Sequence, residues 1–229
     1  MHSTKHNLQI LHEDNHLIVI NKRAGDIVQG DKTGDQPLNE IVKDYIKEKY
    51  NKPGNVYLGT VHRLDRPTSG IVIFAKTSKA LERLNKMLRE KEIKKTYWAV
   101  VKNHPSQKKQ TLVNYLKKNP KNNKSSAYSK EINGSKKAIL HYVVLKELKN
   151  YSLLEIDLET GRHHQIRCQL SNIGFPIKGD LKYGFPRSNK NGSIHLHARK
   201  INFTHPVSKL PIELIAPTPL NDPIWDACN

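Results

Sequence analysis

The sequence predicts an α+β fold in which a mainly antiparallel sheet is flanked by helices. Short runs of β-branched and apolar residues recur along the 229 residues, and several are joined by only a few polar residues, as in hairpins. Strands of this kind outnumber the segments with helical features. Because hairpin-linked strands favour antiparallel pairing, we expect this architecture rather than a doubly wound one.

The first hundred residues predict four strands and two helices. Residues 9–22 form two short strands around a polar turn, and further strands cover 70–76 and 94–102. Pro37 opens the first helix, because proline is favoured at a first helical position, and the second begins at about Ser78. Apolar residues share one face in each: Leu38, Ile41, Val42, Tyr45 and Ile46, then Leu81, Leu84, Met87 and Leu88.

Residues 103–137 interrupt this pattern. Their tract "KKNPKNNKSS" is polar and lysine-rich and cannot bury enough apolar surface to become ordered, so we predict a mobile basic insertion. After it, "AILHYVVL" and "YSLLEIDL" predict a hairpin, and "GRHHQIRCQLSNIG" predicts a turn and a short helix ending at Gly174. The final strands are "IHLHARKINF" and "LPIELIAP". No linker separates these elements, so we expect one domain over 1–229.

The chain carries 39 Lys and Arg against 21 Asp and Glu, a formal net charge of +18. Such a surface attracts polyanions, and nucleic acid is the leading partner. An anionic membrane would also suit the charge, but we find no lipidation motif and no apolar run near transmembrane length. The two cysteines have neither metal nor disulfide-framework spacing, and no signal peptide opens the chain, so we expect a cytoplasmic protein.

The stretch "HRLDRPTSG" (62–70) places Asp65 between Arg63 and Arg66, just before an apolar strand. Such a carboxylate could be a surface ion pair, a metal ligand, or a catalytic group kept ionised by its cationic neighbours. Tyr97 and the segment 162–167 also carry groups that can move protons or pair with a carboxylate. Their spacing alone does not name a reaction.

Five blocks occur in the order found in RluA-type pseudouridine synthases, and the chain resembles that family over nearly its whole length. The blocks are "ILHEDNHLIVINKRAG", "HRLDRPTSGIVIFAK", "KKTYWAVV", "LETGRHHQIRCQLSNIGFPIKGD" and "IHLHARKINFTHPVSKLPIELIAP". The resemblance implies a mixed, mainly antiparallel sheet split by a central active-site cleft. It also implies isomerisation of selected uridines in structured RNA to pseudouridine, with no metal and no cofactor.

The resemblance assigns roles to four residues. Asp65 matches the catalytic carboxylate, and Arg167 matches the arginine that pairs with it. Tyr97 matches a tyrosine whose ring stacks on the base and whose hydroxyl can take or relay the C5 proton, and Arg63 matches the residue that enters the RNA stack where the target nucleotide is flipped out. Without the resemblance, Tyr97 would be interpreted as a tyrosine of the core, and Arg167 as a helix residue that pairs with a nearby acidic residue.

Other residues are expected to bind RNA or to shape the site. We assign RNA contacts to His62 and Arg66, and to Arg162 and His164, which we expect first of all to hold their loop. The lysines of the basic tract can track phosphates: Lys117, Lys118, Lys121 and Lys124. Thr68, Ser69 and Gly70 shape the turn after Asp65.

Two positions depart from the family pattern. His163 replaces a small hydroxyl residue, which puts the hydrogen bonding of its loop in doubt, and Arg23 replaces a proline, which loosens the strand exit and adds charge. The first strand pair begins so early that we expect no separate N-terminal RNA-binding domain. Target choice then rests on the catalytic domain, acting as a monomer on a stem-loop of tRNA or large-subunit rRNA.

Two other classes of function remain to be weighed. A zinc protein would use some of the 12 histidines, and His195 and His197 of "HLH" fall on one face of a strand, but no C-x-x-C pair or H-E-x-x-H accompanies them. A noncatalytic RNA-binding protein would keep the fold and the charge but make no product. The intact set of Asp65, Tyr97 and Arg167 argues against it.

Overall fold

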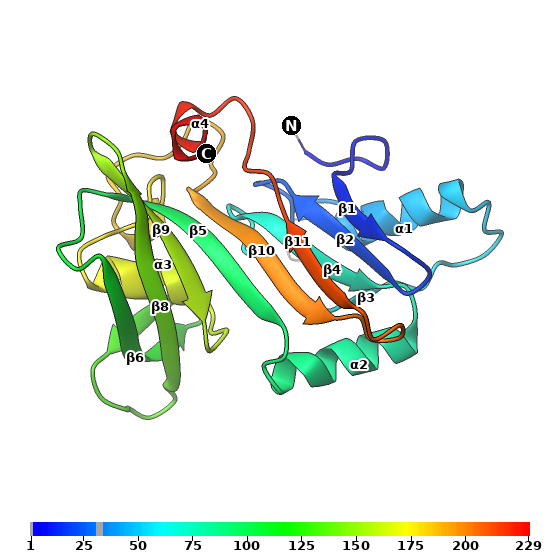
Figure 1. Ribbon diagram of the computed structural model, residues 1–229, viewed down its shortest axis with the longest axis horizontal. Coiled ribbons are helices and arrows are strands. Elements are labelled where there is room, and N and C mark those ends of the chain that lie inside the picture. Colours follow the sequence, from blue (N-terminus) through cyan, green and yellow to red (C-terminus); the bar gives the residue numbers. More distant parts are fainter. Residues whose placement is uncertain (1, 31–33) are drawn as a thin grey trace. The chain divides into compact units, whose positions relative to one another are not determined.

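The computed structural model describes residues 2–30 and 34–229 (Figure 1). The chain divides into two compact units. The first contains Met1–Lys95 and Ala198–Pro219, and the second contains Thr96–His197 and Leu220–Asn229. The prediction of one catalytic domain over 1–229 stays a prediction.

The first unit contains a sheet whose strands follow the order β1 (Ile10–Glu13), β2 (Leu17–Lys22), β4 (Ser69–Ala75), β10 (Leu196–Thr204) and β11 (Pro211–Ile215), with β3 (Gly59–Thr60) paired to β4. β10 belongs to this unit from Ala198 onward. Two helices accompany the sheet, α1 (Leu38–Lys49) and α2 (Ser78–Arg89). Both helices and the expected strands of this region lie where the sequence predicts them.

The core of the first unit forms because β2 and β4 are apolar on both faces and every residue in them is buried. Apolar residues of α1 cover one cluster of these side chains, whose buried members are Ile18, Ile20, Val28, Leu38, Val42, Ile46, Leu58, Val72 and Phe74. Burying a side chain of this size contributes roughly 1.5–3 kcal/mol, so this cluster makes a large contribution to the stability of the unit.

Glu13, at the end of β1, joins the sheet to α1. Its carboxylate accepts hydrogen bonds from Lys49 Nζ at 2.7 Å and Lys76 Nζ at 3.0 Å, and from the hydroxyls of Tyr45 at 3.0 Å and Tyr50 at 2.9 Å. Burial alone raises the pKa of Glu13, but these four donors outweigh it and hold the pKa at about 2. The carboxylate is therefore charged at every physiological pH.

The second unit contains an antiparallel sheet in the order β5 (Lys94–Lys102), β9 (Tyr151–Leu158), β8 (Lys136–Glu147), β6 (Lys109–Asn119) and β7 (Lys124–Tyr128). The helix α3 (Gln165–Asn172) packs against β6 and β7, and a 3-10 turn covers Leu181–Tyr183. A last helix, α4 (Pro223–Cys228), buries Trp225 beside Val100 and Leu153.

The prediction that the tract within 103–137 cannot become ordered is wrong. These residues contain β6 and β7, which form a hairpin, and β6 also pairs with β8 from Lys109 to Leu116. Leu112 and Leu116 of β6 are buried, and Leu116 packs with Ala138 and Cys168. The backbone ladder and these two leucines order a segment whose other residues are mostly polar.

No helix in the described residues is long and apolar enough to cross a membrane.

Candidate functional site

The turn that carries Asp65 lies between β3 and β4. The carbonyl of Asp65 accepts a hydrogen bond from the backbone N–H of Thr68 at 3.0 Å, which closes the turn. Gly70 follows at the start of β4 with φ of +112°, and a Cβ there would lie 2.4 Å from the carbonyl oxygen of Ala198. Only glycine fits this position, because a side chain would be strained and would collide with backbone. Gly70 therefore shapes the turn as predicted.

Lys22, the last residue of β2, fixes the backbone next to Asp65. Its side chain is fully buried, and Nζ donates to the carbonyl oxygens of Arg23 at 2.9 Å, Asp26 at 2.8 Å and Arg66 at 3.2 Å. The N–H of Gly25 donates to the same Arg66 oxygen at 2.8 Å. The residue that follows Asp65 is thus held by two donors from the exit of β2.

Burial lowers the pKa of Lys22 to about 7, and the charges of Asp26 and Asp65 act in the opposite direction. The ammonium and the Asp65 carboxylate are therefore close enough to interact electrostatically. Sequence reasoning missed Lys22. The signal in the sequence was a lysine only two residues after the apolar run "LIVI" (17–20), at the end of a buried strand where a charge is rare unless it has partners.

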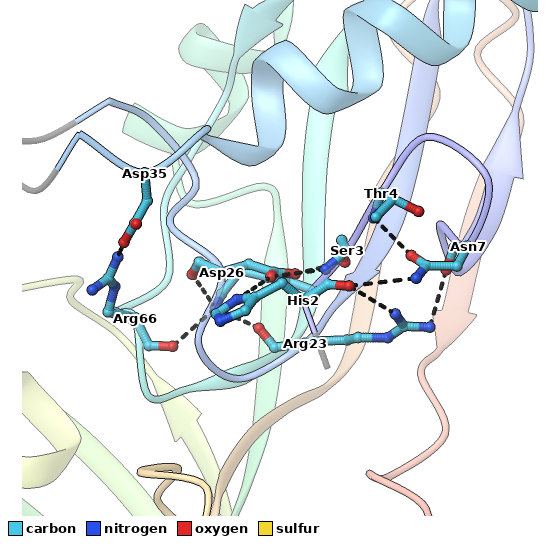
Figure 2. Close-up of polar contacts among 9 residues, drawn as sticks. His2, Ser3, Thr4, Asn7, Arg23, Asp26, Asp35 and Arg66 are labelled. Atoms are coloured by element: carbon cyan, nitrogen blue, oxygen red, sulfur yellow. Dashed lines mark hydrogen bonds and ion pairs between the residues drawn. The ribbon is translucent and has the colours of Figure 1, made fainter.

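Figure 2 shows how the N-terminal segment is attached to this loop. Asp26 accepts hydrogen bonds from the backbone N–H and the hydroxyl of Ser3, at 3.1 and 2.6 Å. Arg23 Nη2 donates to the carbonyl of Asn7 at 3.0 Å. The expectation that Arg23 loosens the strand exit is wrong, because its guanidinium ties the N-terminal turn to the end of β2.

The basic residues around Asp65 differ in their surroundings. Arg63 is exposed, whereas the exposed Arg66 forms an ion pair with Asp35 (Figure 2). His62 Nε2 accepts the backbone N–H of Ile73 at 3.3 Å, and burial, together with a nearby lysine, lowers its pKa to about 3. His62 is therefore neutral at physiological pH and contacts the protein backbone, so any RNA contact from it would not use a charged ring.

In the second unit, Tyr97 and Arg167 come from β5 and α3. Tyr97 pairs with Ile156 of β9 and is buried. Arg167 is buried as well, and its Nε and Nη2 donate to the two carboxylate oxygens of Asp180 at 2.7 and 2.9 Å. Its guanidinium also lies 5.1 Å from the centre of the Tyr183 ring. A two-point ion pair of this kind fixes the orientation of the guanidinium.

The loop before α3 is held by its own polar side chains. Arg162 Nε donates to the carbonyl of Lys137 at 2.9 Å, and His164 Nδ1 shares a hydrogen bond of 2.9 Å with the Tyr183 hydroxyl. His164 has φ of +52°, and its ring stacks on that of His163 at 3.7 Å between centroids. Arg162 and His164 hold this loop, as first expected.

Comparison with known proteins decides the family. Residues 16–172 match the profile of the family described as RNA pseudouridylate synthase. The chain belongs to this family. The prediction of an RluA-type pseudouridine synthase is confirmed, since relatives of that type match nearly the whole chain.

Three relatives illustrate the match. An uncharacterized RNA pseudouridine synthase of Synechocystis sp. is 36% identical, covering 93% of this chain and 66% of the relative. The ribosomal large subunit pseudouridine synthase C of Buchnera aphidicola is 37% identical, covering 92% and 67%. The tRNA pseudouridine synthase C of Pectobacterium carotovorum is 30% identical, covering 96% and 60%. The chain thus spans between 60% and 67% of the length of these relatives.

Two solved human structures have the same fold. RNA Pseudouridylate Synthase Domain Containing 4 matches with a TM-score of 0.77 at 24% identity, covering 93% of this chain and 89% of the other. RNA Pseudouridylate Synthase Domain Containing 1 matches with a TM-score of 0.75 at 23% identity, covering 100% and 90%. The predicted α+β fold is confirmed.

Within this pseudouridine synthase family member, the predicted catalytic residues come from different units. Asp65 belongs to the first unit, whereas Tyr97 and Arg167 belong to the second. That the three form one site stays a prediction. The predicted pairing of Arg167 with Asp65 stays a prediction too, and Asp180, which sequence reasoning did not single out, is a partner that orients Arg167.

The histidines considered for zinc have other partners. His195 Nδ1 accepts a hydrogen bond from the Asn189 amide at 3.0 Å, and its Nε2 lies 3.1 Å from the Asp222 carboxylate. Its ring stacks on Trp225 at 5.1 Å. In the described part of the chain, no three His, Cys, Asp or Glu side chains are grouped so that they could hold a metal ion.

Proposed function

We propose that this member of the RNA pseudouridylate synthase family isomerises specific uridines in structured RNA, with Asp65 as the catalytic carboxylate. The observation that carries the proposal is the Asp65 turn, which occurs in the family's motif and has its backbone fixed by the buried Lys22 and by Gly25. Relatives named for the large ribosomal subunit and for tRNA support a tRNA or rRNA stem-loop as substrate.

The reaction moves one bond and exchanges one proton. The bond from the ribose to N1 of uracil breaks, the ring turns, a bond from the ribose to C5 forms, and the proton at C5 leaves while N1 gains one. Asp65 promotes the first step, either by adding to the sugar or the base or by taking a sugar proton. Because atoms and electrons balance without an oxidant or reductant, we propose that no cofactor takes part.

The other residues have separate tasks in this proposal. Tyr97 provides a ring on which the detached uracil can stack, and its hydroxyl takes or relays the C5 proton. Arg167, oriented by Asp180, keeps the Asp65 carboxylate charged. Arg63 is exposed, so its guanidinium is available to fill the RNA stack when the target nucleotide is extruded.

The net charge of +18 supports RNA as the partner, because basic side chains that neutralise phosphates release counterions. We further propose that the protein acts as a monomer in the cytoplasm, where tRNA and ribosomes are found.

The test is release of tritium from uracil C5. Unmodified tRNA and large-subunit rRNA transcripts carrying tritium at C5 are mixed with purified protein, without added metal or nucleotide. Tritium in the solvent would support isomerisation, and its division between the two RNAs would identify the substrate class. Tight RNA binding with no release would favour the noncatalytic RNA-binding alternative.

A further inference from the structure

The hairpin of β6 (Lys109–Asn119) and β7 (Lys124–Tyr128) is strongly basic. Residues 103–137 contain nine lysines and a single acidic residue, Glu131. Lys117, Lys118 and Lys121 are exposed. In the part of the chain that the structure describes, none of these three lysines forms an ion pair with a carboxylate. Charge on this hairpin is therefore available to an anion.

The same hairpin contains a serine that is buried among polar contacts. Ser125 is 2% exposed, although it lies in the lysine-rich tract "KKNPKNNKSS". Its N–H donates to the Tyr183 hydroxyl at 2.8 Å, its hydroxyl donates to the carbonyl of His163 at 2.8 Å, and its carbonyl lies 3.3 Å from the Cys168 thiol that donates to it. Its hydroxyl and carbonyl thus bind the loop before α3 and the helix itself, which carries Arg167, and its N–H binds the 3-10 turn Leu181–Tyr183.

Two further contacts hold the hairpin in place. The His163 ring, which departs from the family pattern, places Nδ1 at 2.9 Å from the Ser125 hydroxyl. Near the tip, Lys182 Nζ donates to the carbonyls of Asn122 and Asn123 at 3.4 and 3.3 Å. Burying polar groups costs desolvation free energy unless each group has a hydrogen-bond partner. A hairpin with no role beyond its exposed surface would not need such buried hydrogen bonds at its base.

We propose that the β6–β7 hairpin is a docking arm for the phosphate backbone of RNA, and that Ser125 holds the arm in a fixed position relative to Arg167. The arm's lysines bind phosphates, while Ser125 acts as a positioning residue that holds the loop and helix carrying Arg167 against the docked arm. The role of Ser125 rests on the proposed function, because it concerns the geometry of the active site. RNA docking at the arm does not require catalysis.

The docking half is tested by the salt dependence of RNA binding. The triple variant Lys117→Gln, Lys118→Gln, Lys121→Gln is compared with a control that removes three exposed lysines elsewhere, Lys47→Gln, Lys52→Gln, Lys79→Gln. Binding of a fluorescein-labelled hairpin RNA is followed by anisotropy at several salt concentrations. In a plot of log Kd against log salt concentration, the slope for the arm variant should be smaller than that of the wild type by about 2 to 3. Each lost phosphate contact lowers this slope by about 0.7–0.9. Equal slopes for both variants would overturn the docking arm.

The positioning half is tested by comparing Ser125→Ala with Ser126→Ala, the exposed neighbour in the same strand. Ser125→Ala should keep the salt slope of the wild type but lower kcat about 10-fold, because a small displacement of a catalytic group is costly. Ser126→Ala should change neither. A folded Ser125→Ala protein, shown by its circular dichroism spectrum, with wild-type kcat would overturn the coupling.

The two proposals fail in different ways. If the wild type releases no tritium from any RNA, the proposed function fails, and the anisotropy experiment still decides whether the arm binds phosphates. If the wild type is active but the arm variant binds and reacts like the control, the proposed function stands and the docking arm is wrong.

Discussion

Replacing Lys22 with methionine tests the idea that this buried lysine holds the Asp65 loop. Methionine keeps most of the stem volume but removes the donor to the carbonyls of Arg23, Asp26 and Arg66. At pH 9 the wild-type amine is largely neutral and donates two hydrogens. Their loss should destabilise the variant by about 2 kcal/mol, at about 1 kcal/mol per hydrogen bond.

The difference should shrink as the pH falls. Burial lowers the pKa of Lys22 from 10.5 to about 7, so between these values the unfolded chain binds a proton that the native protein does not. The stabilisation that Lys22 provides is therefore complete above its pKa of 10.5 in the unfolded chain, and it is lost as the pH falls to about 7. The wild type loses roughly 1.4 kcal/mol per pH unit in this window, and the variant does not. From pH 9 to pH 7 the wild type therefore loses about 2.8 kcal/mol, more than its advantage of about 2 kcal/mol at pH 9, so at pH 6 the variant should be at least as stable as the wild type.

Urea unfolding of both proteins at pH 6 and pH 9, followed by far-UV circular dichroism, measures the difference in free energy of unfolding. All other titrating groups are shared, so their effects cancel in the comparison. A variant as stable as the wild type at pH 9, or a loss of the same size at both pH values, would refute the reasoning.

Three further predictions concern single residues. Gly70→Ala should lower the free energy of unfolding by more than about 3 kcal/mol in urea, because φ is positive and the new Cβ would collide with Ala198; a loss below 1 kcal/mol would contradict this. Asp180→Asn should cost about 3–5 kcal/mol, since it removes one member of a buried two-point ion pair with Arg167, and unchanged thermal unfolding would argue against a fixed pair. The pKa of Glu13 is lowered to about 2, so the ionised carboxylate stabilises the fold fully above pH 4.5, and this stabilisation is lost as the pH falls toward 2. Glu13→Gln should therefore lose less free energy of unfolding on acidification than the wild type. Parallel acid-unfolding curves for the two proteins would rule this out.

Helices and strands whose apolar residues recur with a clear period could be predicted from the sequence. The strand at Lys94–Lys102 and the helix from Ser78 occur where expected, because alternation and helical spacing reflect which side of an element is buried. The β6–β7 hairpin could not be predicted in this way. Its order depends on pairing with β8 and on two leucines, and both are long-range interactions that local composition does not reveal.

The candidate site was predictable only in part. The resemblance to the family selects Asp65 and Arg167 as candidates, but it does not reveal that Asp180, 13 residues from Arg167, orients the guanidinium. Ser125 lies in a tract that looks solvated, and its partners are 38 and 58 residues away. Contacts at such separations depend on the folded arrangement of strands and loops rather than on neighbouring residues.

The most direct test of the central claim compares the wild type with Asp65→Asn for tritium release and for RNA affinity in the same preparation. Asparagine has nearly the same shape as aspartate but cannot act as a charged nucleophile or base. The account predicts that release falls at least about 1,000-fold while the Kd for RNA changes little, as expected for a group that acts in the transition state. Release by Asp65→Asn at a rate close to that of the wild type would contradict the account.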